Sequence, residues 1–243
     1  MTGSHSLPAV EETMEASTLL ADYPPAPWSF EGSIGISLQL HSRQGQSALL
    51  PPFVEPKWCF GRRVAGVSIW GHLHYSETSQ DDKAFDLALF LSGPVEHGSH
   101  SGWWTESAMV GHPGMYGGLK NIWAFPASLA STFFRGDRPR GQFEFDMGTR
   151  FFAEAGFQRL LPAWEQNRTL SLWTLKDQRL HQARLTVSGR GNPALGGYRL
   201  SRNRILPQLH GLNVVSLWIP HGLMVLEAPE DIDLRGYKPA ANT

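Results

Sequence analysis

The 243-residue sequence contains a single cysteine, Cys59, so no disulfide can form within the chain. It has no apolar run near the roughly 20 residues that a membrane-spanning helix needs. Its opening also lacks the basic start and apolar stretch of a secretory signal. Charged residues make up 18% of the chain, the formal net charge is −1, and no basic run of the kind that binds nucleic acid or anionic membranes is present. We therefore expect a cytoplasmic protein with small-molecule or protein partners, and neither a nucleic acid nor a membrane among them.

Several familiar site motifs are missing as well. There is no Gly-x-Ser-x-Gly elbow, no phosphate-binding Gly-x-x-x-x-Gly-Lys-Ser/Thr loop and no Cys-x-x-Cys pair. The Gly189-x-Gly191 segment runs into Pro193 and strand-like sequence, whereas a dinucleotide-binding loop opens a helix. The sequence therefore predicts no cofactor.

Glycine and proline are plentiful, with 25 and 17 residues, and they separate short segments of alternating or β-rich character. This pattern predicts a mainly β fold, an antiparallel barrel or sandwich, with few helices. We expect strands at residues 33–40, 64–75, 85–91, 143–145, 170–175, 182–187, 214–218 and 224–227, and helices at residues 11–20, 127–133 and 153–161. The length favours one domain over residues 22–243, preceded by a flexible segment of residues 1–21.

The most informative motif lies in residues 116–130. Here the glycine pair Gly117-Gly118 precedes Trp123-Ala124-Phe125-Pro126 and then Leu129-Ala130, while Pro24-Pro25-Ala26-Pro27-Trp28 and Leu49-Leu50-Pro51 lie upstream. These segments resemble the acetoacetate decarboxylase family, whose pattern is Trp-Gly-Phe-Pro, a Schiff-base lysine, often a second lysine, and Leu-Ala. The resemblance covers about residues 22–230. It implies the family's β fold around an apolar pocket, and it is compatible with a homo-oligomer.

The residues that carry the family's chemistry are nevertheless absent. Ala127 and Ser128 occupy both lysine positions, and the spacer after the glycine pair lacks the family's arginine and glutamate. Leu87 stands where the family places a pocket glutamate, unless Asp86 substitutes for it through a shift of one residue. The resemblance thus implies the fold without a Schiff base at the usual position.

Lys120 is one of only five lysines and lies inside this motif. An amine desolvated among Trp123, Phe125 and Tyr116 could lose its proton near neutral pH and attack a ketone. The alternative is a solvated lysine at the edge of a loop.

Other candidates for acid–base chemistry surround the motif. His112 and Tyr116 precede the glycine pair, and Glu106 follows a tryptophan pair after a polar, glycine-containing loop at residues 96–102 that is suited to act as a lid. An arginine is the natural anchor for an acidic substrate, because its guanidinium can hold a carboxylate through two hydrogen bonds. The candidate catalytic residues are therefore Lys120, His112, Glu106 and Tyr116, and the candidate substrate-binding residues are Trp104, Trp123, Phe125, Ala127, Ser128 and Arg204.

His72 and His74 form a His-x-His on an expected strand, where alternate side chains share a face and could reach one metal ion. The pattern resembles the metal-binding strand of cupins, but Glu77 follows too closely for that motif. We assign no metal to the site and keep a metal-dependent β-barrel enzyme as one alternative function.

These observations together favour a small-molecule enzyme of specialised metabolism. Without a Schiff-base lysine, its remaining tools are shape, desolvation and general acid–base groups. We expect a cyclase, isomerase or dehydratase that acts on a keto-acid or polyketide-like substrate. The main alternative is a non-catalytic binding protein that has kept the cavity and lost the chemistry.

Overall fold

The computed structural model describes residues 25–42, 50–57, 59–76, 84–137, 139–201 and 211–232. These residues form one large sheet and one α-helix, so the expected mainly β fold is confirmed. The elements are β1 (Trp28–Ser42), β2 (Glu55–Pro56), β3 (Cys59–Phe60), β4 (Arg63–Tyr75), β5 (Phe85–His97), β6 (His100–Val110), α2 (Pro113–Asn121), β7 (Ala127–Leu129), β8 (Ser131–Asp137), β9 (Arg140–Asp146), β10 (Phe152–Arg159), β11 (Trp164–Lys176), β12 (Arg179–Ser201), β13 (Leu212–Leu226) and β14 (Glu230–Ile232).

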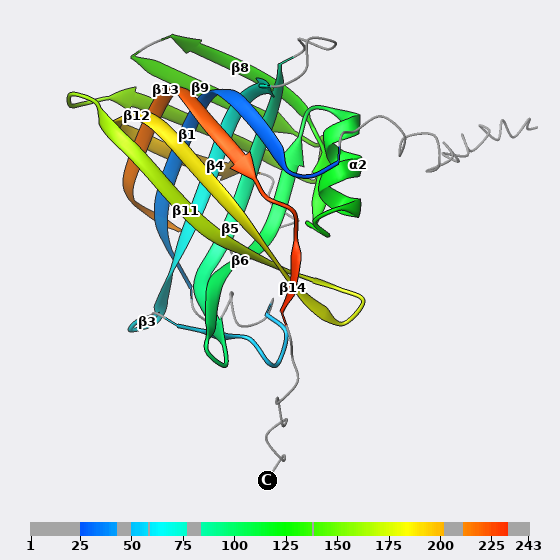
Figure 1. The fold of residues 1–243 in the computed structure, drawn as a ribbon. Coiled ribbons are helices and arrows are strands. Elements are labelled where there is room, and N and C mark those ends of the chain that lie inside the picture. Colours follow the sequence, from blue (N-terminus) through cyan, green and yellow to red (C-terminus); the bar gives the residue numbers. More distant parts are fainter. Residues whose placement is uncertain are drawn as a thin grey trace, which may run out of the picture.

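Seven of the strands close into a barrel (Figure 1). Their order is β11-β6-β5-β4-β1-β13-β12, and β12 pairs again with β11. Every neighbouring pair is antiparallel except β6 and β11, which run parallel and meet only at Trp103–Leu172 and Trp104–Trp173. The barrel core lies inside and includes Ile34, Ile69 and Leu89, which are fully or almost fully buried.

A second sheet layer packs against the outside of this barrel. The last residues of β12 pair with β10, and β9 and β8 continue the sheet beyond it. A second core, rich in aromatic side chains, lies between this layer and the barrel wall; it includes Trp70, Phe90, Phe143 and Trp218. Strands β4 and β5 therefore contribute side chains to both cores, and nearly every residue of β5 is buried.

The single described helix, α2, lies against one end of the barrel (Figure 1). His112 caps it, because its Nδ1 accepts a hydrogen bond from the backbone N–H of Met115 at 3.4 Å, and Pro113 fits the first turn. Met115 and Leu119 point into the barrel core. The helix thus plugs this end of the barrel.

Two expected helices are wrong. Residues 127–133 form β7 and the start of β8, and residues 153–161 fall largely in β10. In β10 the apolar Ala153, Ala155 and Phe157 alternate with polar or small residues, and that period of two places one face in the second core. The expected helix at residues 11–20 and the flexible segment at residues 1–21 lie outside the described residues. No helix among the described residues is long and apolar enough to cross a membrane.

Candidate functional site

Most of the family-like motif belongs to the wall and plug of the barrel. Trp123 and Phe125 are buried in the barrel core, and Ala127 packs against the same core. The indole N–H of Trp123 donates to the backbone oxygen of Glu227 at 2.7 Å, and the Thr174 hydroxyl donates to the backbone oxygen of Trp123 at 2.9 Å. In this protein these residues anchor the chain after α2 to the end of the barrel.

Lys120 lies on the exposed side of α2. Its Nζ is 3.2 Å from the Tyr116 hydroxyl and 5.4 Å from the centre of the Tyr116 ring. The side chain is exposed, so the desolvation on which a relocated Schiff base depends is missing at this position. His112, Tyr116 and Lys120 are close together only because they share this helix and its cap.

Two further predicted site residues are Trp104 and Arg204. Trp104 lies neither with the buried motif residues nor with the residues of α2 and its cap. Trp104 packs in a third, smaller cluster with Trp173, Val95 and Leu180. Arg204 lies outside the described residues.

Ser128 instead lies on the second-core face of the barrel wall, and Glu106 acts electrostatically on Tyr198, which packs against that core. In the parallel pairing of β6 with β7, Ala108 is opposite Ala127 and Met109 is opposite Ser128. Ala108 and Ala127 face the barrel core, whereas Met109 faces the second core, so Ser128 is on the second-core face. The two positions that carry lysines in the resembled family thus point to opposite sides of the barrel wall.

Glu106 owes its orientation to a β-bulge. Ser107 is opposite Phe90 and Thr105 is opposite Leu91, so Glu106 is the extra residue of β6. Its side chain is buried, with 8% of the residue exposed. A bulge often redirects a side chain next to an active site, and here it places a carboxylate beside the second core.

The negative charge of Glu106 acts on the phenol of Tyr198, a residue of β12. Its ring centre lies 5.6 Å from that of Phe90 and 5.9 Å from that of Trp70. Burial raises the pKa of Tyr198 above its ordinary value, and the negative charge of Glu106 raises it further. The phenol therefore keeps its proton across the physiological pH range and can donate it in a hydrogen bond.

A polar cluster of Ser37, Gln39, Ser68, Asn213 and Ser216 continues from these two residues along the second-core face. The hydroxyls of Ser37 and Ser216 are 3.0 Å apart. The Gln39 amide donates to the Ser68 hydroxyl at 3.1 Å and to the Asn213 side-chain oxygen at 3.4 Å. Both Asn213 and Ser216 donate to the backbone oxygen of Gly196, two residues before Tyr198. Polar groups are therefore concentrated at one end of an otherwise aromatic core.

His41 extends the polar side of this face. Its imidazole lies between Gly66 and Gly211, where a Cβ on either glycine would collide with the ring. Only 3% of His41 is exposed, and burial lowers its pKa to about 4. Its Nδ1 has no hydrogen-bond partner among the described residues. A neutral imidazole at this position can both donate and accept a hydrogen bond.

A cleft of about 440 Å³ reaches the cluster from outside. It forms because β12 leaves β13 after the pair Ala194–Ser216 and continues with β10 alone. Tyr198, Asn213, Gly196 and Gly197 line this opening. Glu106, Tyr198, His41 and the polar cluster constitute the candidate site, and the cleft opens beside Tyr198 and Asn213.

The two histidines of the His-x-His segment have different environments. The Nδ1 of His72 is 2.7 Å from Oδ1 of Asp86, and its ring stacks on Phe134 with centres 4.3 Å apart. His74 is exposed. Within the described part of the chain, no group of three or more histidine, cysteine, aspartate and glutamate side chains could hold a metal ion.

Sequence reasoning identified Glu106 but missed most of its surroundings. In β1, Ser37, Gln39 and His41 alternate with apolar residues, a pattern usually typical of a strand with one solvated face. The structure places these polar side chains in a second core. The alternation of these polar residues is therefore visible in the sequence. The outer sheet layer that covers them is not.

Comparisons with known proteins agree with this architecture. No family model matches the sequence, and no curated protein matches it. Acetoacetate decarboxylase from Legionella pneumophila subsp. pneumophila strain Philadelphia 1 aligns with 96% of this chain and 98% of its own, at 18% identity and a TM-score of 0.64. The enduracididine biosynthesis enzyme MppR aligns with 95% of this chain and 98% of its own, at 16% identity and a TM-score of 0.63.

A third structure, an acetoacetate decarboxylase-like enzyme from Sphingomonas wittichii RW1, aligns with 87% of this chain and 94% of its own, at 11% identity and a TM-score of 0.61. Similarity at such low identities is a similarity of fold. It extends over nearly the whole chain, including both the barrel and the outer layer. The protein therefore has the acetoacetate-decarboxylase-like fold.

Proposed function

We propose that the protein is an enzyme that acts on a keto-acid or polyketide-like carbonyl compound by non-covalent acid–base chemistry, as an isomerase, cyclase or dehydratase. The observation that carries the proposal is the buried Glu106 carboxylate, whose charge acts on the Tyr198 phenol at one end of the second core. Carboxylate and phenol have complementary roles at a carbonyl compound.

In this reaction the Glu106 carboxylate takes a proton from the carbon next to the carbonyl group. The electron pair of the broken C–H bond forms the enolate, and negative charge develops on the carbonyl oxygen. Tyr198, a phenol that is protonated at physiological pH, donates a hydrogen bond to that oxygen. Return of the proton from Glu106 to another carbon of the conjugated system gives isomerisation. In dehydration, the enolate expels the β-hydroxyl group, which takes the proton from the Glu106 carboxyl group and leaves as water, and a carbon–carbon double bond forms.

The positions of the described lysines favour this chemistry over a Schiff base. Lys120 is exposed on α2, and Lys57 is exposed 3.9 Å from Glu96. Lys176 donates to the backbone oxygen of Asn121 at 3.0 Å. None of these three lysines belongs to the candidate site.

The substrate class draws support from proteins of the same fold. MppR has been solved in complex with pyruvate and with the condensation product of pyruvate and imidazole 4-carboxaldehyde. Those complexes concern MppR alone, but a fold that accommodates a keto acid there makes keto acids the first compounds to test here.

The test is exchange of the carbon-bound protons of α- and β-keto acids in deuterated water, followed by proton NMR. We expect exchange to be accelerated by the protein and to fall by about 10²-fold or more in Glu106→Gln, which removes the base with little change in volume. Tyr198→Phe, which removes one hydrogen-bond donor to the enolate, should lower the rate by about 10². Glu165→Gln, which alters an exposed carboxylate on β11, is the matched control. Equal rates in Glu106→Gln and in the unmodified protein would refute the assignment of the base.

The second candidate is a non-catalytic binding protein, favoured by the loss of both motif lysines to Ala127 and Ser128. It predicts saturable binding of a carbonyl compound with no exchange above the rate of the free compound. In that case Glu106→Gln would change affinity alone.

A further inference from the structure

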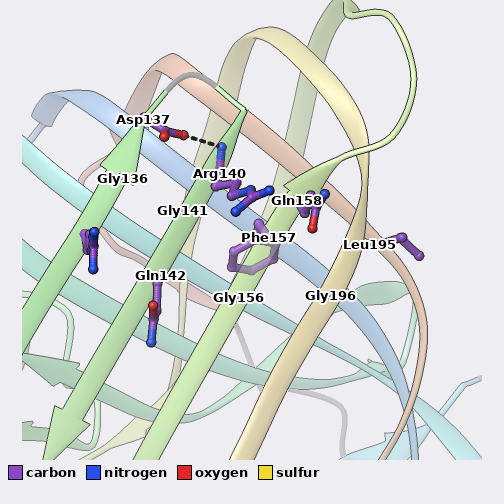
Figure 2. A pocket seen from close by; sticks show the side chains of 11 residues that line it. Gly136, Asp137, Arg140, Gly141, Gln142, Gly156, Phe157, Gln158, Leu195 and Gly196 are labelled. Carbon is purple, nitrogen blue, oxygen red and sulfur yellow. Dashed lines mark hydrogen bonds between the residues drawn. The ribbon is translucent and has the colours of Figure 1, made fainter.

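A groove of about 660 Å³ lies on the outer face of the second layer, across β8, β9, β10 and β12. Register creates it: Arg135 is opposite Gln142, and Arg140 is opposite Gln158. Gly156 lies beside Gln142, and a Cβ built there would meet no atom within 4 Å. The missing side chain leaves a depression surrounded by two guanidiniums and two amides, which we call the arginine groove (Figure 2).

The charge of the arginine groove is positive. Its ionisable lining residues are Arg135, Arg140 and Asp137. Among the described residues, neither arginine is within salt-bridge distance of a carboxylate, whereas Arg199, on a neighbouring strand, pairs with Glu154 at 3.6 Å. Oδ1 of Asp137 accepts the backbone N–H of Arg140 at 2.9 Å, which directs this carboxylate toward the turn. Two guanidiniums with free donors are thus left for an anion.

The amides and an apolar wall indicate more than a simple ion. In Figure 2, the Arg140 side chain extends toward Gln158. Leu195, with 58% of its surface exposed, stands at the far side of the groove. The guanidiniums and the Gln158 amide suit a carboxylate, whereas the Gln142 amide donates to the Glu144 carboxylate at 3.2 Å. The leucine side chain offers contact to a hydrocarbon portion.

We propose that the arginine groove binds a small organic acid, with its carboxylate held by Arg135 and Arg140 and its apolar portion against Leu195. This groove is on the outer face of the layer and shares Gln142, Gly156 and Gly196 with the cleft beside Tyr198. Its existence does not depend on the proposed reaction.

The test uses phenylacetate as a probe and phenylacetamide as its neutral counterpart, with binding measured by ligand-observed NMR on the full chain. We expect phenylacetate to bind with a Kd on the order of 1 mM. Phenylacetamide should bind about tenfold more weakly, and Arg140→Gln or Arg135→Gln should weaken phenylacetate by a similar factor. Gly156→Leu should abolish binding, since its side chain occupies the depression, and its Cβ meets no atom within 4 Å. Arg168→Gln, which removes an exposed arginine from β11, should change the Kd by less than about twofold.

Three results would overturn the proposal. The first is the absence of saturable phenylacetate binding up to about 50 mM. The second is binding that Arg140→Gln and Gly156→Leu leave unchanged in proteins with wild-type unfolding curves, which would place the acid elsewhere. The third is inorganic phosphate that binds as tightly as phenylacetate with the same dependence on Arg140, which would make the groove a simple anion site.

Discussion

His41 links the candidate site to the pH dependence of stability. Burial lowers its pKa from 6.5 to about 4, so between these values the unfolded chain binds a proton that the folded chain does not. The free energy of unfolding should therefore be independent of this group above pH 6.5 and fall as the pH drops below it. Between pH 7.5 and pH 5 the loss should be about 2 kcal/mol.

Urea unfolding of the unmodified protein and of His41→Leu at both pH values measures this effect. The variant lacks the titrating group. The unfolding free energy of the unmodified protein, relative to that of the variant, should therefore be lower at pH 5 than at pH 7.5 by the stated amount. A difference that stays constant with pH would mean that the His41 imidazole is hydrated in the folded protein.

Individual residues of the candidate site differ in how far the sequence could predict them. Glu106 was predicted because it follows a lid-like polar loop and a tryptophan pair, although its orientation depends on a bulge that no residue type announces. Tyr198 was not predicted, because only the tertiary packing of β12 brings it near Glu106. Ser128 was predicted from the position of a family lysine, and pairing with β6 places it on the second-core face.

At the scale of single elements, the packing of α2 against the barrel requires a glycine, although glycine has a low helix propensity. Gly118 is a poor helix former, yet a Cβ there would be 2.1 Å from Cη2 of Trp28, a fully buried ring that packs against Trp123. Gly118 of the motif is therefore required for contact between α2 and the barrel.

Gly118→Ala should lower the free energy of unfolding by about 1–3 kcal/mol, because overpacking outweighs the gain in helix propensity. Chemical unfolding followed by tryptophan fluorescence measures it. Gly156→Ala in β10 is the control, since its added methyl group enters open space, and its stability should be unchanged or slightly higher. An increase in stability for Gly118→Ala would show that Trp28 can move away from α2.

The strands most accessible to sequence reasoning were those with regular alternation or a long apolar run. The runs in β4 and β5 were predicted as strands and are buried on both faces. The helix expected at residues 127–133 is wrong because residues 127–129 pair with β6 and residues 131–133 pair with β9, and local propensity encodes neither pairing. Strands could thus be predicted where apolar residues alternate regularly or form a long run.

At the scale of the whole molecule, the two cores are joined through shared strands. Leu89 and Phe90 are neighbours in β5, yet Leu89 faces the barrel core and Phe90 faces the second core. Loss of either core would expose the same strands, so the barrel and its outer layer should unfold together.

Leu89→Ala and Phe90→Ala should each lower the free energy of unfolding by about 2–5 kcal/mol while leaving a single transition. Circular dichroism in the far and near ultraviolet should give coincident curves for both variants. Two separated transitions in Phe90→Ala would show that the outer layer unfolds independently of the barrel.

The sequence predicted a mainly β barrel or sandwich, and the structure combines features of both through β12. This strand pairs with β11, β13 and β14 along its first part and with β10 along its last part. The change of partner falls in a glycine- and proline-containing segment, residues 188–197, with a register shift between Gly189 and Asn192, and such a segment is typical of a turn in local sequence. The outer layer therefore could not be predicted from local sequence. The possible homo-oligomer stays a prediction.

The order of strands along the chain has a consequence for biosynthesis. β1 is the first described strand to leave the ribosome, but its neighbour β13 is among the last, with Ile34 paired to Ile219. Until β13 emerges, β1 and β12 each present an open edge, and apolar faces of both cores are incompletely covered. Closure is thus a late event of translation, and a nascent chain stalled before Leu212 would be a natural client for chaperones.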